Sequence, residues 1–78
     1  MNGFSLSELP LGQRGTIQEI KINGAMRRRL LEMGFHAGET VKCMYIAPQG
    51  SPIAFLVKGA LVALRRNDCR CVTVTHYE

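Results

Sequence analysis

Cysteines and histidines are the residues of this chain that could hold a soft metal ion. Cys69 and Cys71 are separated by one residue, His76 follows, and Cys43 lies far upstream. Thiolate and imidazole groups suit zinc or iron in tetrahedral sites. Segment 71–75, however, alternates like a strand that buries its valines, so Cys71 would face away from them while Cys69 lies in the preceding turn. The thiols then need not converge, and we predict neither a dedicated metal site nor a bound cofactor.

Catalysis would require a nucleophile, a base and an orienting group gathered in one pocket. The sequence contains a single aspartate, Asp68, and its imidazoles, His36 and His76, stand in no known catalytic signature. A chain of 78 residues also buries too little surface to build a large cleft. We therefore expect no catalytic residues and no enzymatic activity.

Two clusters of arginine give the stronger functional signal. Arg28 has a glutamate four residues later and fits an exposed helix face. Arg27 and Arg29 flank it beside an apolar stripe, where their stems can cover hydrophobic surface while their guanidinium groups meet a partner's carboxylates. Arg65 and Arg66 follow a predicted strand. We predict that Arg27, Arg29, Arg65 and Arg66 form a partner-binding surface.

Nucleic acid is the alternative ligand for these charges, because the formal net charge is +4. Small barrels that bind nucleic acid usually stack bases on aromatic side chains interleaved with Lys and Arg. Aromatic residues are scarce here and tryptophan is absent. Most of the few aromatic residues fall in phase with the core, and the full set is Phe4, Phe35, Tyr45, Phe55 and Tyr77. We therefore do not expect nucleic-acid binding, nor a groove for proline-rich peptides.

Composition places the chain among ordinary globular domains, with 46% hydrophobic and 21% charged residues. Its 78 residues fit one domain, which we expect over 1–78 with a core of about 6–75. The first ten residues lack a basic region followed by an apolar core, and no apolar stretch is long enough to span a bilayer. We expect a cytoplasmic protein with reduced thiols and no membrane insertion.

Frequent glycines and prolines divide the sequence into short segments, which predict strands joined by tight turns. The predicted strands are 15–22, 40–47, 53–57, 60–64 and 71–75. Their number and length favour a mainly β fold, a small SH3-like β-barrel of about five strands with one inserted α-helix, because a barrel closes its own edges. A helical turn is expected at 65–68.

The inserted helix is predicted at 25–33, about three turns long. Met26, Leu30 and Met33 recur at helical spacing and form one apolar stripe. An asparagine, Asn23, could cap the first turn, and a glycine after Met33 could end the helix. Phe35 would then fold back onto Leu30.

Three ordered runs of residues resemble the FeoA family of ferrous iron transport accessory proteins. They are Arg27-x-Arg29-Leu30-x-x-Met33-Gly34-Phe35-x-x-Gly38, then Ala47-Pro48-x-Gly50-x-Pro52, then Gly59-x-x-Val62-Ala63-Leu64-Arg65-Arg66. The chain is also similar to the C-terminal domain of DtxR-type metal-dependent repressors, without their DNA-binding part. The family often has an aspartate after the turn glycine, where this chain has Ser51.

This resemblance implies an SH3-like barrel in the cytoplasm that works with FeoB, a membrane Fe²⁺ transporter with a GTPase domain, and has no enzyme activity of its own. Our interpretation is therefore an accessory protein that docks on FeoB and modulates it by contact. The alternative is a free-standing regulatory or nucleic-acid-binding SH3-like barrel, and a metal carrier ranks below both.

Overall fold

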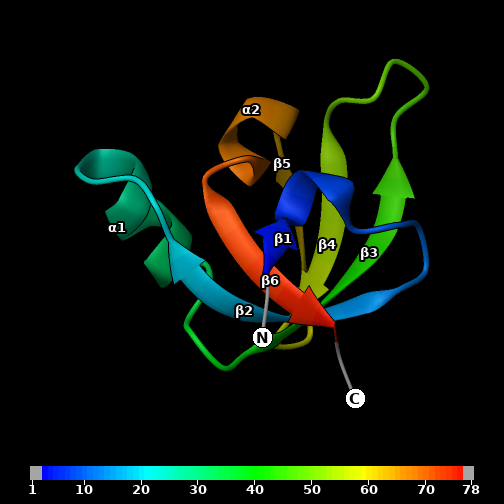
Figure 1. Ribbon diagram of the computed structural model, residues 1–78. Coiled ribbons are helices and arrows are strands. Elements are labelled where there is room, and N and C mark those ends of the chain that lie inside the picture. Colours follow the sequence, from blue (N-terminus) through cyan, green and yellow to red (C-terminus); the bar gives the residue numbers. More distant parts are fainter. Residues whose placement is uncertain (1–2, 77–78) are drawn as a thin grey trace.

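The short alternating segments of the sequence form six strands in one antiparallel sheet, as the computed structural model shows for residues 3–76 (Figure 1). Along the chain the elements are β1 (Phe4–Ser5), η1 (Leu6–Glu8), β2 (Arg14–Ile20), α1 (Ala25–Glu32), β3 (Thr40–Ile46), β4 (Ile53–Val57), β5 (Ala60–Leu64), α2 (Arg66–Cys69) and β6 (Val72–His76). The strand order is β1-β6-β2-β3-β4-β5. The predicted mainly β class with an inserted helix is confirmed, and so is the helical turn before the last strand.

The sheet differs from the prediction at its two edges. In the described part of the chain, β1 and β5 end the strand order without pairing with each other, so the expectation of a barrel that closes its own edges is wrong. β1 is a sixth strand that the sequence did not indicate, because two residues are too few to show alternation. Its Phe4 pairs with Val74 in β6.

A β-bulge in β3 changes which side chains reach the core. The register against β4 shifts between Cys43 and Tyr45, and the extra residue reverses the alternation beyond that point. Cys43 is buried, but Tyr45 is 55% exposed, so its predicted core position is wrong. A second bulge, between Ile17 and Glu19 in β2, accounts for the imperfect alternation of that segment.

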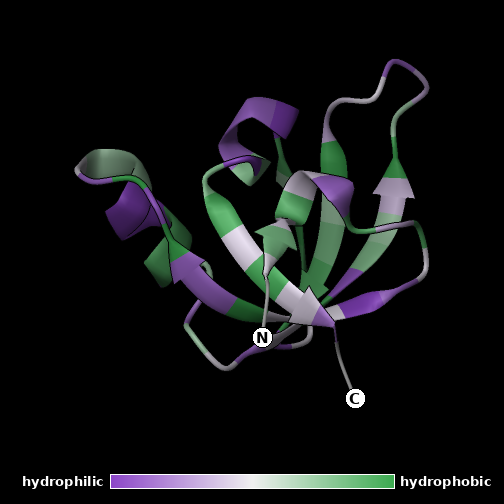
Figure 2. Ribbon diagram, viewed as in Figure 1, coloured by the Kyte–Doolittle hydropathy of each residue, from purple (hydrophilic) through white to green (hydrophobic). Residues whose placement is uncertain are grey.

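The core lies inside the curved sheet, and η1, α1 and α2 each add one buried residue to it: Leu6, Leu30 and Cys69. Phe35 and Phe55 meet edge to face, with ring centroids 6.5 Å apart. Within residues 3–76, fifteen buried apolar residues form this core: Leu6, Leu9, Ile17, Ile20, Leu30, Phe35, Val41, Cys43, Ile53, Phe55, Val57, Leu64, Cys69, Val72 and Val74. Hydrophobic residues line β4 and β5, whereas α2 in front of them is strongly hydrophilic (Figure 2).

Helix α1 ends as predicted and begins differently. The amide of Phe35 donates to the carbonyl of Leu30 at 3.0 Å beyond Gly34 (φ 105°), which gives the expected Schellman ending. The helix has eight residues and not three turns, and Gly24 with φ 85° occupies the N-cap position. Asn23 therefore lies one residue too early, and its predicted capping role is wrong.

The exposed face of α1 also lacks a predicted contact. Arg28 and Glu32 form no ion pair, and among the described residues an ion pair instead joins Lys58 to Glu39 at 3.6 Å. This absence agrees with the small net stabilisation that exposed pairs provide.

The β4–β5 hairpin turns through two residues, Lys58 (φ 51°) and Gly59 (φ 78°). Positive φ at both central positions is typical of a type I′ turn, whose twist matches that of the adjoining strands. The turn closes on the pair Val57 and Ala60. This hairpin was predicted, and it fixes which groups of β5 face the open edge of the sheet.

Candidate partner-binding site

The cysteines lie in separate environments. Cys43 and Cys69 are buried, and Cys71 is half-buried with its thiol 3.9 Å from the carbonyl of Asn67. Burial raises the pKa of the Cys69 thiol to about 12 and also raises that of Cys43, so both stay protonated near neutral pH. Residues 3–76 contain no group of three or more His, Cys, Asp or Glu placed to hold a metal ion.

The histidines are equally dispersed. His36 is exposed after α1, whereas His76 stacks beside Phe4 with ring centroids 4.8 Å apart. Asp68 lies on α2, in a different part of the surface. The expectation of no catalytic site stays a prediction.

Arg66 belongs to the structure of the domain. Its Nε donates to the carbonyl of Gly50 and its Nη1 to that of Ser7, both at 2.7 Å. Its backbone amide donates to the hydroxyl of Ser51 at 3.1 Å. One half-buried side chain thereby joins η1 and the β3–β4 turn to α2, segments that are far apart in the sequence.

Arg27 is also partly committed to the backbone. Its Nη1 donates to the carbonyl of Ile20 at 2.8 Å, at the end of β2. This bond fastens α1 to the sheet, although the side chain remains exposed. Of the four arginines predicted to bind a partner, Arg27 and Arg66 therefore use guanidinium donors in hydrogen bonds within the domain.

Arg29 and Arg65 are brought together by the fold. They line one hollow of about 240 Å³ between α1 and β5, with Met26, Met33, Ala63, Leu64 and Asp68. We call this hollow the α1–β5 groove. Both arginines are exposed, and neither side chain forms a hydrogen bond within the part of the chain that the structure describes. The groove therefore combines an apolar lining with two available guanidinium groups and one carboxylate.

The methionines of the groove are residues whose role sequence reasoning missed. The helical stripe placed Met26 and Met33 in the core, but they are only partly buried and their remaining surface lines the groove. A long, flexible thioether at the border of an apolar stripe was the available signal, since methionine is common at adaptable binding surfaces.

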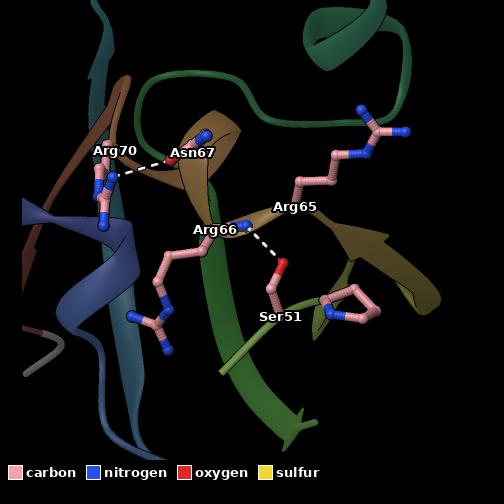
Figure 3. A pocket seen from close by; sticks show the side chains of 6 residues that line it. Ser51, Arg65, Arg66, Asn67 and Arg70 are labelled. Carbon is pink, nitrogen blue, oxygen red and sulfur yellow. Dashed lines mark hydrogen bonds between the residues drawn. The ribbon is translucent and has the colours of Figure 1, made fainter. Parts of the chain in front are cut away.

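A second hollow of about 460 Å³ is lined by three arginines whose guanidinium groups do not point to a common centre (Figure 3). Its lining includes Arg65, Arg66 and Arg70 together with Ser51 and Asn67. In Figure 3 the three side chains point in different directions, Arg65 toward the segment around α1 and Arg66 away from it. Arg70 is held by the side-chain oxygen of Asn67 at 2.8 Å. The guanidinium groups do not converge, so this hollow does not form an anion pocket.

A further open hollow of about 460 Å³ is lined by Gly12, Gln13, Arg14, Lys42 and His76. It is basic, but no Phe or Tyr lines it: Phe35 and Phe55 are buried, Phe4 is half-buried against His76, and the exposed Tyr45 lies outside the lining. This hollow therefore lacks an aromatic platform.

Together, the curved antiparallel sheet of six strands and the short helices around it define the class of the protein: a small, mainly β domain with an open sheet. The sequence pattern described as the FeoA domain matches residues 4–76. The chain belongs to the FeoA family.

Known relatives agree with this assignment. The chain is 36% identical over 69 residues to a Porphyromonas gingivalis fusion of Fe(2+) transport protein A with the Fe(2+) transporter FeoB. That match covers 88% of this chain but 8% of the fusion protein, so the chain spans less than a tenth of the curated relative it matches. In the fusion, the two transport proteins are parts of one polypeptide.

Solved structures confirm the fold. The FeoA protein of Chlorobium tepidum is 35% identical with a TM-score of 0.90, covering 96% of this chain and 71% of that one. FeoA of Stenotrophomonas maltophilia, a zinc complex described as a procaryotic SH3 domain protein, is 35% identical with a TM-score of 0.82, covering 91% and 88%. The SH3-like class predicted from the sequence is thereby confirmed.

The predicted likeness to metal-dependent repressors is confirmed at the level of the fold. IdeR of T. acidophilum is 15% identical with a TM-score of 0.87, covering 99% of this chain and 35% of that one. Such low identity shows a shared fold alone. Within residues 3–76 no helix is long and apolar enough to cross a membrane.

Proposed function

We propose that this chain is a non-enzymatic accessory protein of ferrous iron uptake. It docks on a FeoB-type membrane Fe²⁺ transporter that carries a GTPase domain, and it modulates the transporter by contact from the cytoplasmic side. The observation that carries the proposal is the P. gingivalis fusion, which joins a counterpart of 88% of this chain to FeoB. Fusion keeps two proteins at high effective concentration, as would suit two proteins that act by contact.

The α1–β5 groove is the surface that best supports such docking. Arg29 and Arg65 offer unused guanidinium donors beside the apolar surface of Met26 and Met33. Arginine next to apolar surface is a frequent centre of binding energy in protein interfaces, because it combines contact area with directed hydrogen bonds. Arg27 and Arg66 remain predicted partner contacts, with fewer free donors to offer.

Modulation by contact has a simple thermodynamic requirement. The accessory protein shifts the transporter between conformational or nucleotide states only if it binds one state more tightly than another. Neither gathered catalytic groups nor a bound metal are needed for this action. The proposal therefore agrees with the dispersed thiols and imidazoles of residues 3–76.

The alternative, a free-standing nucleic-acid-binding or regulatory module, draws on one observation, the basic hollow at Arg14, Lys42 and His76. Binding there would be dominated by phosphate contacts, so its affinity would fall steeply with salt. Without aromatic stacking, we expect only weak binding to generic DNA or RNA at physiological salt.

The test is direct binding to the transporter reconstituted in nanodiscs, with empty nanodiscs as the blank. We expect saturable binding that a double variant, Arg29→Ala with Arg65→Ala, weakens by about tenfold or more. The matched control is Arg28→Ala with Arg70→Ala, which removes the same charge from residues outside the groove and should change affinity by less than about threefold. Iron uptake by cells that depend on the chain should follow the same order. Two results would refute the docking function. One is that the unaltered chain shows no saturable binding to the transporter under any condition. The other is submicromolar binding to DNA that falls steeply with salt, together with unchanged iron uptake in the double variant.

A further inference from the structure

The outer edge of β5 pairs with no other strand in the described part of the chain. β5 (Ala60–Leu64) ends the strand order and consists of five uncharged apolar residues. Leu61, at its centre, is 65% exposed. Proteins usually protect such an edge with charges, proline or a covering element, because its free backbone groups can pair with another strand.

Register identifies which backbone groups of β5 are available. The two-residue turn closes on the pair Val57 and Ala60, which is the hydrogen-bonded kind of pair, and hydrogen-bonded and non-hydrogen-bonded pairs then alternate along the hairpin. Leu61, opposite Leu56, and Ala63 therefore direct their amide and carbonyl groups away from β4. Within residues 3–76, no other element forms a hydrogen bond to these groups.

The edge is also one wall of the α1–β5 groove. Ala63 and Leu64 line the groove from β5, and Met26 and Met33 line it from α1. An extended segment laid along β5 would therefore gain backbone pairing on one side and an apolar seat for a side chain on the other. These are the two elements of recognition by strand addition, in which main-chain bonds supply affinity and pockets supply specificity.

Charge around the edge selects the kind of occupant. Lys58, which is ion-paired with Glu39, precedes β5, Arg65 follows it, and Arg29 faces it across the groove, against one lining carboxylate, Asp68. Antiparallel pairing of β5 with a second copy would bring the Arg65 end of each strand to the Lys58 turn of the other. Like charges disfavour that arrangement, whereas an apolar segment flanked by Asp or Glu complements it.

We propose that the β5 edge and the α1–β5 groove together bind an acid-flanked apolar segment of the partner as an added antiparallel or parallel strand. The segment pairs with the backbone of Leu61 and Ala63, seats an apolar side chain against Met26 and Met33, and places its carboxylates near Arg29 and Arg65. This proposal rests on the proposed function for the origin of the segment, which is the transporter.

Amide hydrogen exchange tests the pairing residue by residue. The chain is exposed to D₂O alone or with transporter nanodiscs, then quenched, separated and read by NMR. We expect the outward amides of Leu61 and Ala63 to slow by about tenfold when about nine-tenths of the chain is bound. Val62 and Leu64 donate inward to β4 and serve as the internal reference, with a smaller change expected.

Substitution at Leu61 separates backbone pairing from side-chain contact. Leu61→Pro removes an amide that points to the open edge, so it breaks no bond to β4, and proline is tolerated at such edge positions. We expect it to weaken binding to the nanodiscs by about tenfold. Leu61→Thr, which keeps the amide and removes the apolar side chain, should weaken binding by about threefold or less. If Leu61→Pro does not fold by circular dichroism, the exchange measurement on the unaltered chain still decides.

The outcomes distinguish this proposal from the function on which it rests. If the unaltered chain fails to bind the transporter, both fall. Saturable binding with no change at Leu61 and Ala63, or with Leu61→Pro and Leu61→Thr equal to the parent, overturns strand addition and leaves the docking function standing. If these amides become protected in the absence of the transporter, and more so as the chain concentration rises, the edge binds a second copy. That result also overturns the proposal.

Discussion

Replacing Arg66 by alanine tests the assignment of that side chain to the structure of the domain. The change removes two hydrogen bonds of 2.7 Å, to the carbonyls of Gly50 and Ser7, and with them the connection of η1 and the β3–β4 turn to α2. Because the site is half-buried, each bond to the charged group should contribute about 1 to 1.5 kcal/mol, which gives a loss of about 2 to 3 kcal/mol.

That loss is large for this chain. A domain of 78 residues has an expected free energy of unfolding of roughly 4 to 12 kcal/mol. Since about 1 kcal/mol moves the melting temperature of a domain this small by about 4 to 8 °C, Arg66→Ala should melt roughly 8 to 24 °C below the parent.

Thermal unfolding followed by circular dichroism measures this shift, with two matched controls. Arg65→Ala removes the neighbouring arginine, which is exposed and forms no hydrogen bond within residues 3–76, so its melting temperature should stay within a few degrees of the parent. Arg66→Lys keeps the charge but cannot reproduce the two directed bonds, and its melting temperature should lie in between. Equal melting temperatures for Arg66→Ala and Arg65→Ala would refute the structural role.

Three further predictions follow from buried groups. Leu30→Ala should destabilise the domain by about 2 to 5 kcal/mol, measured by urea unfolding, and a shift below about 1 kcal/mol would contradict the burial of Leu30 in the core. Because the pKa of the Cys69 thiol is raised to about 12 in the folded chain, the unfolded chain loses this proton first as pH rises above 9. The contribution of Cys69 to the free energy of unfolding should therefore be fully present below pH 9 and fall by up to about 1.4 kcal/mol per pH unit toward pH 12. Cys69→Ala should reduce that slope in thermal melts at graded pH. Purified chain should carry no near-equimolar iron or zinc by elemental analysis, and a metal that is lost on changing Cys69 and Cys71 to serine without unfolding would overturn this.

Local signals carried most of the successful sequence inference. The ending of α1 depended on neighbouring residues, with a glycine placed to adopt positive φ and Phe35 placed to return to Leu30, and the structure has that ending. The Lys58–Gly59 turn was likewise readable, because Gly59 adopts positive φ readily and lies between two apolar runs, although lysine itself does not favour the positive φ of Lys58. Both features depend on glycines whose backbone freedom the sequence states directly.

Features that depend on distant partners were not readable. The bulge that turns Tyr45 outward is a shift of β3 against β4, and nothing in the β3 segment alone marks the extra residue. Strand β1 exists because it pairs with β6 at the other end of the chain. The same limit applies to the arginines. Arg66 donates to carbonyls that are 16 and 59 residues away, so nothing in the local sequence distinguished it from its exposed neighbour Arg65.

The open edge of β5 is also a consequence of the small size of the domain. Closing the sheet would have required pairing between β1 and β5, and β1 has only two residues. Helix α1 packs on the core through Leu30, with Phe35 following it, and it stands off far enough from β5 to leave the α1–β5 groove between them. The same short elements that limit closure therefore leave backbone groups, methionine surface and arginine charge side by side. A partner segment that completes the sheet would bury surface that the chain is too short to cover by itself.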